Sequence, residues 1–259
     1  MGYVLESPNE ADRLEYQSTL PKYNYREELK SFSTQPGEVV LDAGCGSGVV
    51  TRHLATVHPL STFLGIDFST ERVDYAKNSC RALNNVSFRQ GDLTNLFLES
   101  DSVDRIVNRY VLEHIPQEKT SQVINEFYRV LRPGGVAYLV DFDEPLLNIY
   151  PTTEAMEQVI SALKNSKDMD FRVARKMPSM LSKAGFQNIE WSMQTVEVSK
   201  EALKAEMSLI PDKLELISPF INDLTDEVTT KRFIKDYVET LSRPGMTLFY
   251  NKFIAIGSK

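Results

Sequence analysis

Cysteine and histidine, the residues that build disulfide frameworks and many metal centres, are scarce in this chain. Its 259 residues include two cysteines, Cys45 and Cys80, and three histidines. Two cysteines do not make a disulfide framework, and neither stands among His or Asp residues at metal-ligand spacing. We therefore expect a cytoplasmic protein in a reducing compartment, with no metal site.

Long apolar runs and an excess of basic residues are also missing. No segment approaches the roughly 18 apolar residues of a membrane span, and the N-terminal residues do not follow the pattern of a signal peptide. The formal net charge of −7 disfavours a protein that follows a phosphate backbone, although a local basic patch stays compatible with it. We predict a small-molecule substrate, with neither nucleic acid nor membrane as partner.

What the chain does have is a glycine-rich turn at the end of an apolar strand. Residues 39–41 are apolar, Asp42 follows, and Gly44, Gly46 and Gly48 then occupy alternate positions. Such a turn lets a ligand approach the bare backbone. Its spacing differs from the Gly-x-Gly-x-x-Gly of dinucleotide enzymes and favours a nucleoside that carries an amino acid. A glycine turn that binds nothing is the alternative.

A second apolar strand, residues 62–67, ends in the carboxylate of Asp67. Residues 50–57 carry a helix-period apolar stripe that supplies the crossover between the two strands. An acidic residue at the tip of the second strand of such a unit can accept both ribose hydroxyls of a nucleoside. The other interpretation of Asp67 is a helix cap or a surface charge.

Further strand patterns continue the same alternation with helices. They cover residues 86–90, 104–110, 136–141, 189–198 and 247–256. The pattern predicts an α/β fold, a doubly wound Rossmann-like sheet of seven mostly parallel strands whose last strand is antiparallel and lies beside the sixth. Helices at the N-terminus and a helical insertion before the last strand complete the predicted architecture.

The order of the motifs resembles that of the class I S-adenosylmethionine (SAM)-dependent methyltransferases, specifically the type 11/25-like small-molecule group. The resemblance covers residues 39–141 and is specific only when its motifs are taken together. The motifs that carry it are Leu-Asp-Ala-Gly-Cys-Gly-Ser-Gly at 41–48, Gly-Ile-Asp-Phe-Ser at 65–69, Gly-Asp-Leu at 91–93, Leu-Glu-His-Ile at 112–115 and Leu-Arg-Pro-Gly-Gly at 131–135.

This resemblance implies SAM as the cofactor and a set of residues that hold it. The turn would hold the methionine and ribose, Asp67 the ribose, Asp92 and Leu93 the adenine, and Asn108 with Arg109 the amino-acid end. Arg72 would lie near the adenine, with a solvated arginine as the alternative. The complete cofactor set is Asp42, Gly44, Cys45, Gly46, Gly48, Asp67, Phe68, Arg72, Asp92, Leu93, Asn108 and Arg109.

Methyl transfer is an in-line displacement at carbon, so the protein has to align nucleophile and methyl group and exclude water. His114, in the loop after the fourth strand, is the candidate general base, although a residue packed beneath the site is the other interpretation. Tyr110, Asp141 and Asp143 are further candidates. A SAM-binding protein with another reaction, or with none, is the alternative function.

Three segments organise the predicted chain. Residues 1–36 form an N-terminal helical cap, in which Tyr3, Tyr16 and Gln17 could contact the ligand or simply pack on the surface. Residues 37–199 and 244–259 form the SAM-binding domain. Residues 200–243 form an amphipathic helical lid over the acceptor pocket, or alternatively a helix pair that stabilises the sheet edge or a homodimer.

Overall fold

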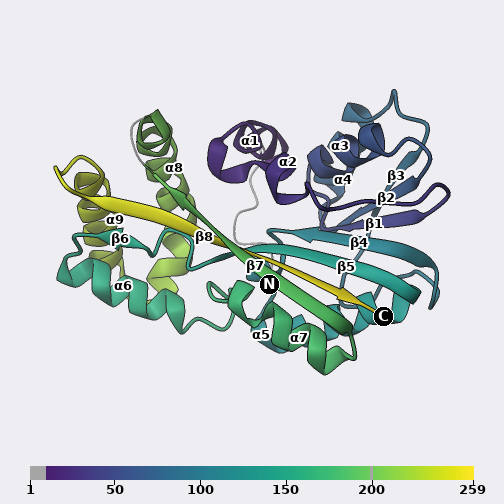
Figure 1. The fold of residues 1–259 in the computed structure, drawn as a ribbon. Coiled ribbons are helices and arrows are strands. Elements are labelled where there is room, and N and C mark those ends of the chain that lie inside the picture. Colours follow the sequence, from purple (N-terminus) through teal and green to yellow (C-terminus); the bar gives the residue numbers. More distant parts are fainter. Residues whose placement is uncertain (1–9, 199–200) are drawn as a thin grey trace.

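The computed structural model describes residues 10–198 and 201–259 and is built on a twisted sheet (Figure 1). Strand order is β3-β2-β1-β4-β5-β8, with β7 on the other edge of β8. The pairs among β1 to β5 are parallel, whereas β8 runs antiparallel to both β5 and β7. The strands are β1 (Val39–Ala43), β2 (Thr62–Asp67), β3 (Val86–Gln90), β4 (Val103–Arg109), β5 (Leu131–Asp143), β6 (Ile149–Tyr150), β7 (Gln187–Glu197) and β8 (Thr247–Ser258).

This arrangement confirms the predicted fold class, with one addition to the strand count. In the described part of the chain the sheet has eight strands, because the two-residue strand β6 pairs with the beginning of β8. A strand of two residues is too short to show an alternating pattern, so periodicity did not reveal it. The antiparallel last strand lies beside the sixth predicted strand, as expected.

Helices cover both faces of the sheet, as the alternation of strands and helices requires. Figure 1 shows α1 to α4 on one side and α5 with α7 on the other. Short 3-10 turns η1 (Pro21–Tyr23), η2 (Leu112–His114) and η3 (Ala174–Lys176) join these elements. The helices are α1 (Glu10–Gln17), α2 (Tyr25–Glu28), α3 (Val49–Val57), α4 (Thr70–Ser79), α5 (Gln117–Val130), α6 (Glu154–Lys164), α7 (Met177–Ala184), α8 (Glu201–Leu224) and α9 (Glu227–Leu241).

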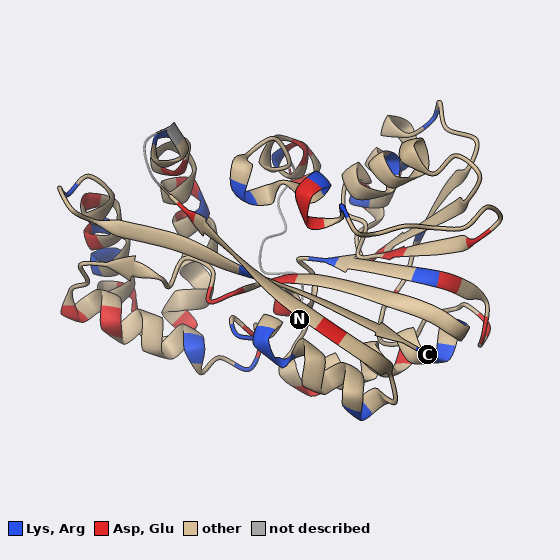
Figure 2. Cartoon of the chain, in the orientation of Figure 1, with Lys and Arg blue, Asp and Glu red and all other residues tan. Residues whose placement is uncertain are grey.

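The helices predicted as a lid, α8 and α9, pack together with α6 around the beginning of β8 (Figure 1). Their apolar stripes form one buried cluster that includes Ile210 and Leu214 of α8, Tyr237 of α9 and Met156 of α6. Most of the apolar face of α8 is therefore used for packing against neighbouring helices. Figure 2 shows acidic and basic residues interspersed on the outer sides of these helices. Within residues 10–198 and 201–259, no helix is long and apolar enough to cross a membrane.

A buried cluster of charges fastens the N-terminal segment to the sheet. Glu28, which is fully buried at the end of α2, accepts from Arg109 of β4 at 2.6 Å and from Lys252 of β8 at 2.7 Å. The hydroxyl of Tyr110 donates to the same carboxylate at 2.7 Å. Burial alone would raise the pKa of Glu28, but the two cations outweigh it and lower the pKa. This carboxylate thus compensates two buried positive charges.

We predict that Glu28→Gln lowers the free energy of unfolding by about 3–5 kcal/mol, because it leaves Arg109 and Lys252 buried without a counter-charge. Urea denaturation followed by circular dichroism measures the change. Glu27→Gln, the same substitution at the adjacent exposed position, is the matched control and is expected to leave the midpoint unchanged. Equal midpoints for both variants would contradict this account.

Candidate functional site

The turn between β1 and α3 adopts a backbone that strongly favours glycine. Gly44, Gly46 and Gly48 have φ values of +83°, +52° and +82°. At Gly44 space is also lacking, since a Cβ there would lie 2.3 Å from a methyl carbon of Val111. The turn therefore presents peptide groups, and not side chains, at the carboxyl edge of the sheet, where ligands bind in folds of this kind.

The tip of β2 is joined directly to this turn. The carbonyl of Ile66 accepts from the amides of Gly44 at 2.7 Å and Cys45 at 3.0 Å. One oxygen of the buried Asp67 carboxylate accepts from the amide of Gly46 at 2.9 Å, and the other accepts from Arg72 Nε at 2.9 Å. Asp67 thus lies against the glycine turn as expected, and Arg72 is its buried ion-pair partner.

The residues predicted to bind adenine lie next to Asp67, because β3 pairs in parallel with β2. Leu93 is buried, and Phe68 is 61% exposed. One oxygen of the exposed Asp92 accepts from the amide and hydroxyl of Thr94, each at 2.8 Å. Phe97 also lies here, 3.4 Å from a Cβ built on Gly91. Nothing in the spacing of the motif indicated Phe97, since it follows an irregular loop.

Asn108 and Arg109, adjacent in β4, point to different neighbours. Asn108 is fully buried, and its amide nitrogen donates at 2.7 Å to the carbonyl of Ala43, just before the glycine turn. Its Oδ1 has no hydrogen-bond partner within the described chain, and a buried acceptor of this kind is costly unless a ligand supplies a donor. Arg109 instead binds Glu28 and the carbonyl of Tyr23.

Asp42 lies beneath the turn. Its carboxylate accepts from the hydroxyl of Thr51 in α3 at 2.5 Å, which ties the end of β1 to the helix that follows. Burial raises the pKa of Asp42 to about 6, and the nearby charge of Asp67 contributes to the rise. Cys45, also in the turn, is buried, and burial raises the pKa of its thiol, so this cysteine is not an activated nucleophile.

The candidate bases have different surroundings. His114 Nε2 lies 3.3 Å from Glu113 Oε1, and the fully buried Asp141 of β5 accepts from the amide of Glu113. Asp143 forms an ion pair with Arg175, Nε to Oδ1 2.7 Å. Tyr110, whose φ is +58°, donates to Glu28 as described above. The two remaining histidines, His53 and His58, make edge contacts with Tyr25 and Phe32, as expected of packing residues.

Helix α1 covers the glycine turn. A Cβ built on Gly46 would lie 3.1 Å from Leu14, and Glu15 binds Arg52 of α3 at 2.8 Å. Tyr16 is 52% exposed, and Gln17 accepts from Arg13 within the helix. Tyr3 lies outside the described residues. The N-terminal segment therefore contacts the predicted cofactor crevice through Leu14.

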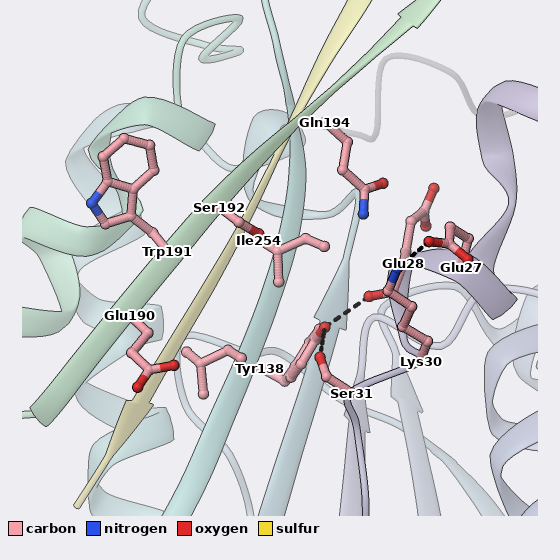
Figure 3. A pocket seen from close by; sticks show the side chains of 11 residues that line it. Glu27, Glu28, Lys30, Ser31, Tyr138, Glu190, Trp191, Ser192, Gln194 and Ile254 are labelled. Carbon is pink, nitrogen blue, oxygen red and sulfur yellow. Dashed lines mark hydrogen bonds and ion pairs between the residues drawn. The ribbon is translucent and has the colours of Figure 1, made fainter.

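A separate cavity of about 210 Å³ lies on the sheet face between α2 and the β7–β8 edge (Figure 3). It is lined by Ser31, Tyr138, Ser192, Gln194 and Ile254, among others. The hydroxyls of Ser31 and Tyr138 are 3.0 Å apart, and Tyr138 donates to the backbone of Glu28 at 2.7 Å. This cavity is distinct from the predicted cofactor site at the carboxyl edge.

Comparisons with known proteins identify the family of the chain. Residues 40–135 match a family model described as a methyltransferase domain. Over 181 residues the chain is 30% identical to demethylmenaquinone methyltransferase of Lactococcus lactis, covering 63% of this chain and 71% of that protein. It is 32% identical over 191 residues to an uncharacterized 37.1 kDa transposon protein of Streptomyces fradiae, covering 71% of this chain but only 55% of that one.

Among solved structures, phosphoethanolamine N-methyltransferase 2 of Haemonchus contortus, in complex with SAM, matches 92% of this chain and 52% of its own with a TM-score of 0.60. At 17% identity this likeness shows the fold alone. The fold and the glycine turn define an α/β protein of the doubly wound, Rossmann-like class. Together with its relatives, they show that the chain belongs to the class I SAM-dependent methyltransferases.

We predict that Asp42 makes stability fall as pH rises. A carboxyl whose pKa is about 3.8 unfolded and about 6 folded contributes stability below pH 4 that is lost as pH rises through 6. Over the whole pH range, Asp42 changes the free energy of unfolding by about 3 kcal/mol. Acidification from pH 7 to 5 should therefore raise the free energy of unfolding of the wild type by roughly 1 kcal/mol more than that of Asp42→Asn. Denaturation curves at both pH values measure this, and equal pH dependence would contradict the assignment.

Proposed function

We propose that this chain transfers the methyl group of SAM to a small-molecule acceptor by in-line displacement. The observation that carries the proposal is the left-handed glycine turn bonded to the buried carboxylate of Asp67. A bare peptide turn beside such a carboxylate offers donors and acceptors to a nucleoside that bears an amino acid. The demethylmenaquinone methyltransferases among the relatives support a small-molecule acceptor.

The residues present fit this cofactor. Asp67 would accept the ribose hydroxyls, and Asp92 retains one carboxylate oxygen for the adenine amino group. The unpartnered Asn108 Oδ1 would accept from the ammonium group of the methionine part. When bound, SAM supplies an activated methyl group on a sulfonium. The protein then has to orient the acceptor and exclude water. Such orientation lowers the activation barrier by several kcal/mol.

The acceptor would enter over the carboxyl ends of β4 and β5. There the ring of Tyr110 stacks on Phe142 with centroids 4.2 Å apart, and Tyr23 packs edge-on against both. We propose that these rings form an apolar wall on that side of the cofactor site, which favours an acceptor with apolar surface. We propose that the N-terminal cap and α8 enclose it.

The activity is tested by incubating the protein with labelled SAM and a panel of small-molecule acceptors, including demethylated quinones. We expect one methylated product and an equal amount of S-adenosylhomocysteine (SAH). A protein that uses SAM without transfer would bind it and yield no SAH with any acceptor. That outcome would contradict the proposed activity.

We predict that Asp67→Asn weakens SAH binding by roughly 1–3 kcal/mol, because a charged partner of the ribose hydroxyls is replaced by a neutral one. Isothermal titration calorimetry measures the affinity. Asp74→Asn, an exposed position on α4 that pairs with Lys77, is the matched control and should bind like the wild type. Unchanged affinity in a folded Asp67→Asn protein would remove Asp67 from the site.

A further inference from the structure

Besides Asp67, two further buried carboxyl groups lie at the carboxyl ends of β4 and β5. Glu113 is 8% exposed in the turn η2, and Asp141 is fully buried in β5. The amide of Glu113 donates to one oxygen of Asp141 at 3.3 Å, and the amide of Phe142 donates to the other at 2.8 Å. The carboxyl of Asp141 therefore holds the backbone of the turn that carries Glu113.

The surroundings shift the pKa values of the two carboxyls in opposite directions. Burial raises the pKa of Asp141 well above its usual value, and the nearby charge of Glu113 raises it further. Burial would raise the pKa of Glu113 as well, but His114 and Lys213 of α8 outweigh it and lower the pKa. Two neighbouring acids whose pKa values are shifted apart typically have distinct roles in proton transfer.

The position of Glu113 relates it to the methyl donor. Val111, two residues before it, packs against Gly44 of the cofactor turn, so η2 begins at the crevice. The charge of Lys213 in α8 also acts on Glu113 and lowers its pKa. The loop that follows α6 also packs here, because the amide of Asp170 donates to the carbonyl of Glu113 at 2.9 Å. Glu113 thus stands in a turn that contacts both the glycine turn and the loop after α6.

We propose that Glu113 is the catalytic carboxylate that faces the transferred methyl group and takes the proton of the acceptor. This inference rests on the proposed function and deepens it. Asp141 and His114 are then positioning residues, the first through the backbone of η2 and the second through its contact with the Glu113 carboxylate. His114, the base expected from the sequence, would act through its neighbour.

The proposed step is balanced without a further reactant. A lone pair of the acceptor forms the bond to the methyl carbon, and the carbon–sulfur bond breaks with its electron pair on sulfur. The acceptor proton passes to the carboxylate of Glu113, which later releases it to water. The acceptor class is therefore a nucleophile that loses a proton on methylation, namely a hydroxyl, an N–H or an activated C–H group.

The test compares the affinity of two ligands and needs no acceptor. One is SAH, and the other is a SAM analogue that carries an ammonium group where the methylsulfonium would be. A carboxylate that faces the methyl position stabilises the ammonium analogue and leaves SAH unaffected. Calorimetry on the wild type, Glu113→Gln and Glu118→Gln gives the ratio of the two affinities, with the exposed Glu118 of α5 as the matched control.

We expect Glu113→Gln to lower the preference for the ammonium analogue about tenfold, with SAH affinity unchanged, and Glu118→Gln to keep the wild-type ratio. Glu113→Asp, which keeps the charge, should retain part of the preference and serves if the Gln variant does not fold. An unchanged ratio in folded Glu113 variants that bind SAH would overturn the inference alone. A wild type that binds neither ligand would overturn the proposed function and this inference with it.

Discussion

The site depends on the junction between the glycine turn and the tip of β2. Parallel pairing of β1 with β2 brings both strand ends to one edge of the sheet, and the carbonyl of Ile66 and the carboxylate of Asp67 then bind successive amides of the turn. A side chain at Gly44 would collide with Val111. The turn therefore presents backbone at the predicted cofactor site, and its shape follows from hydrogen bonds that a ligand does not have to create.

One apolar contact and several buried ion pairs connect the glycine turn to the remainder of the molecule. The N-terminal segment reaches the glycine turn through Leu14, the sheet through Glu28, and helix α8 through a buried ion pair between Lys22 and Glu206. The hydroxyl of Tyr250 donates to the same Glu206 at 3.1 Å. A buried ion pair that loses one partner is strongly destabilising. These contacts therefore fix the cap and α8 over one edge of the sheet.

The sequence predicted the parts of the site that depend on local patterns. Strand periodicity and the alternate glycines placed Asp67 and Gly46 near each other, and these residues do make contact. Contacts between distant parts of the chain were not predictable. Arg109 turns to Glu28, and Asp141 holds the turn of Glu113, because tertiary packing brings together residues that no spacing rule relates. The apolar stripe of α8 likewise could not reveal whether a ligand or α6 covers it.

The structure of crystals grown in the presence of SAH tests the central claim, the position of the cofactor site, most directly. We expect the ligand in the crevice over β1 and β2, with its ribose hydroxyls on the carboxylate of Asp67 and its ammonium group on Asn108 Oδ1. The ligand bound at another place, such as the cavity beside Tyr138, would contradict the account. Crystals that contain no SAH at saturating concentration would contradict it equally.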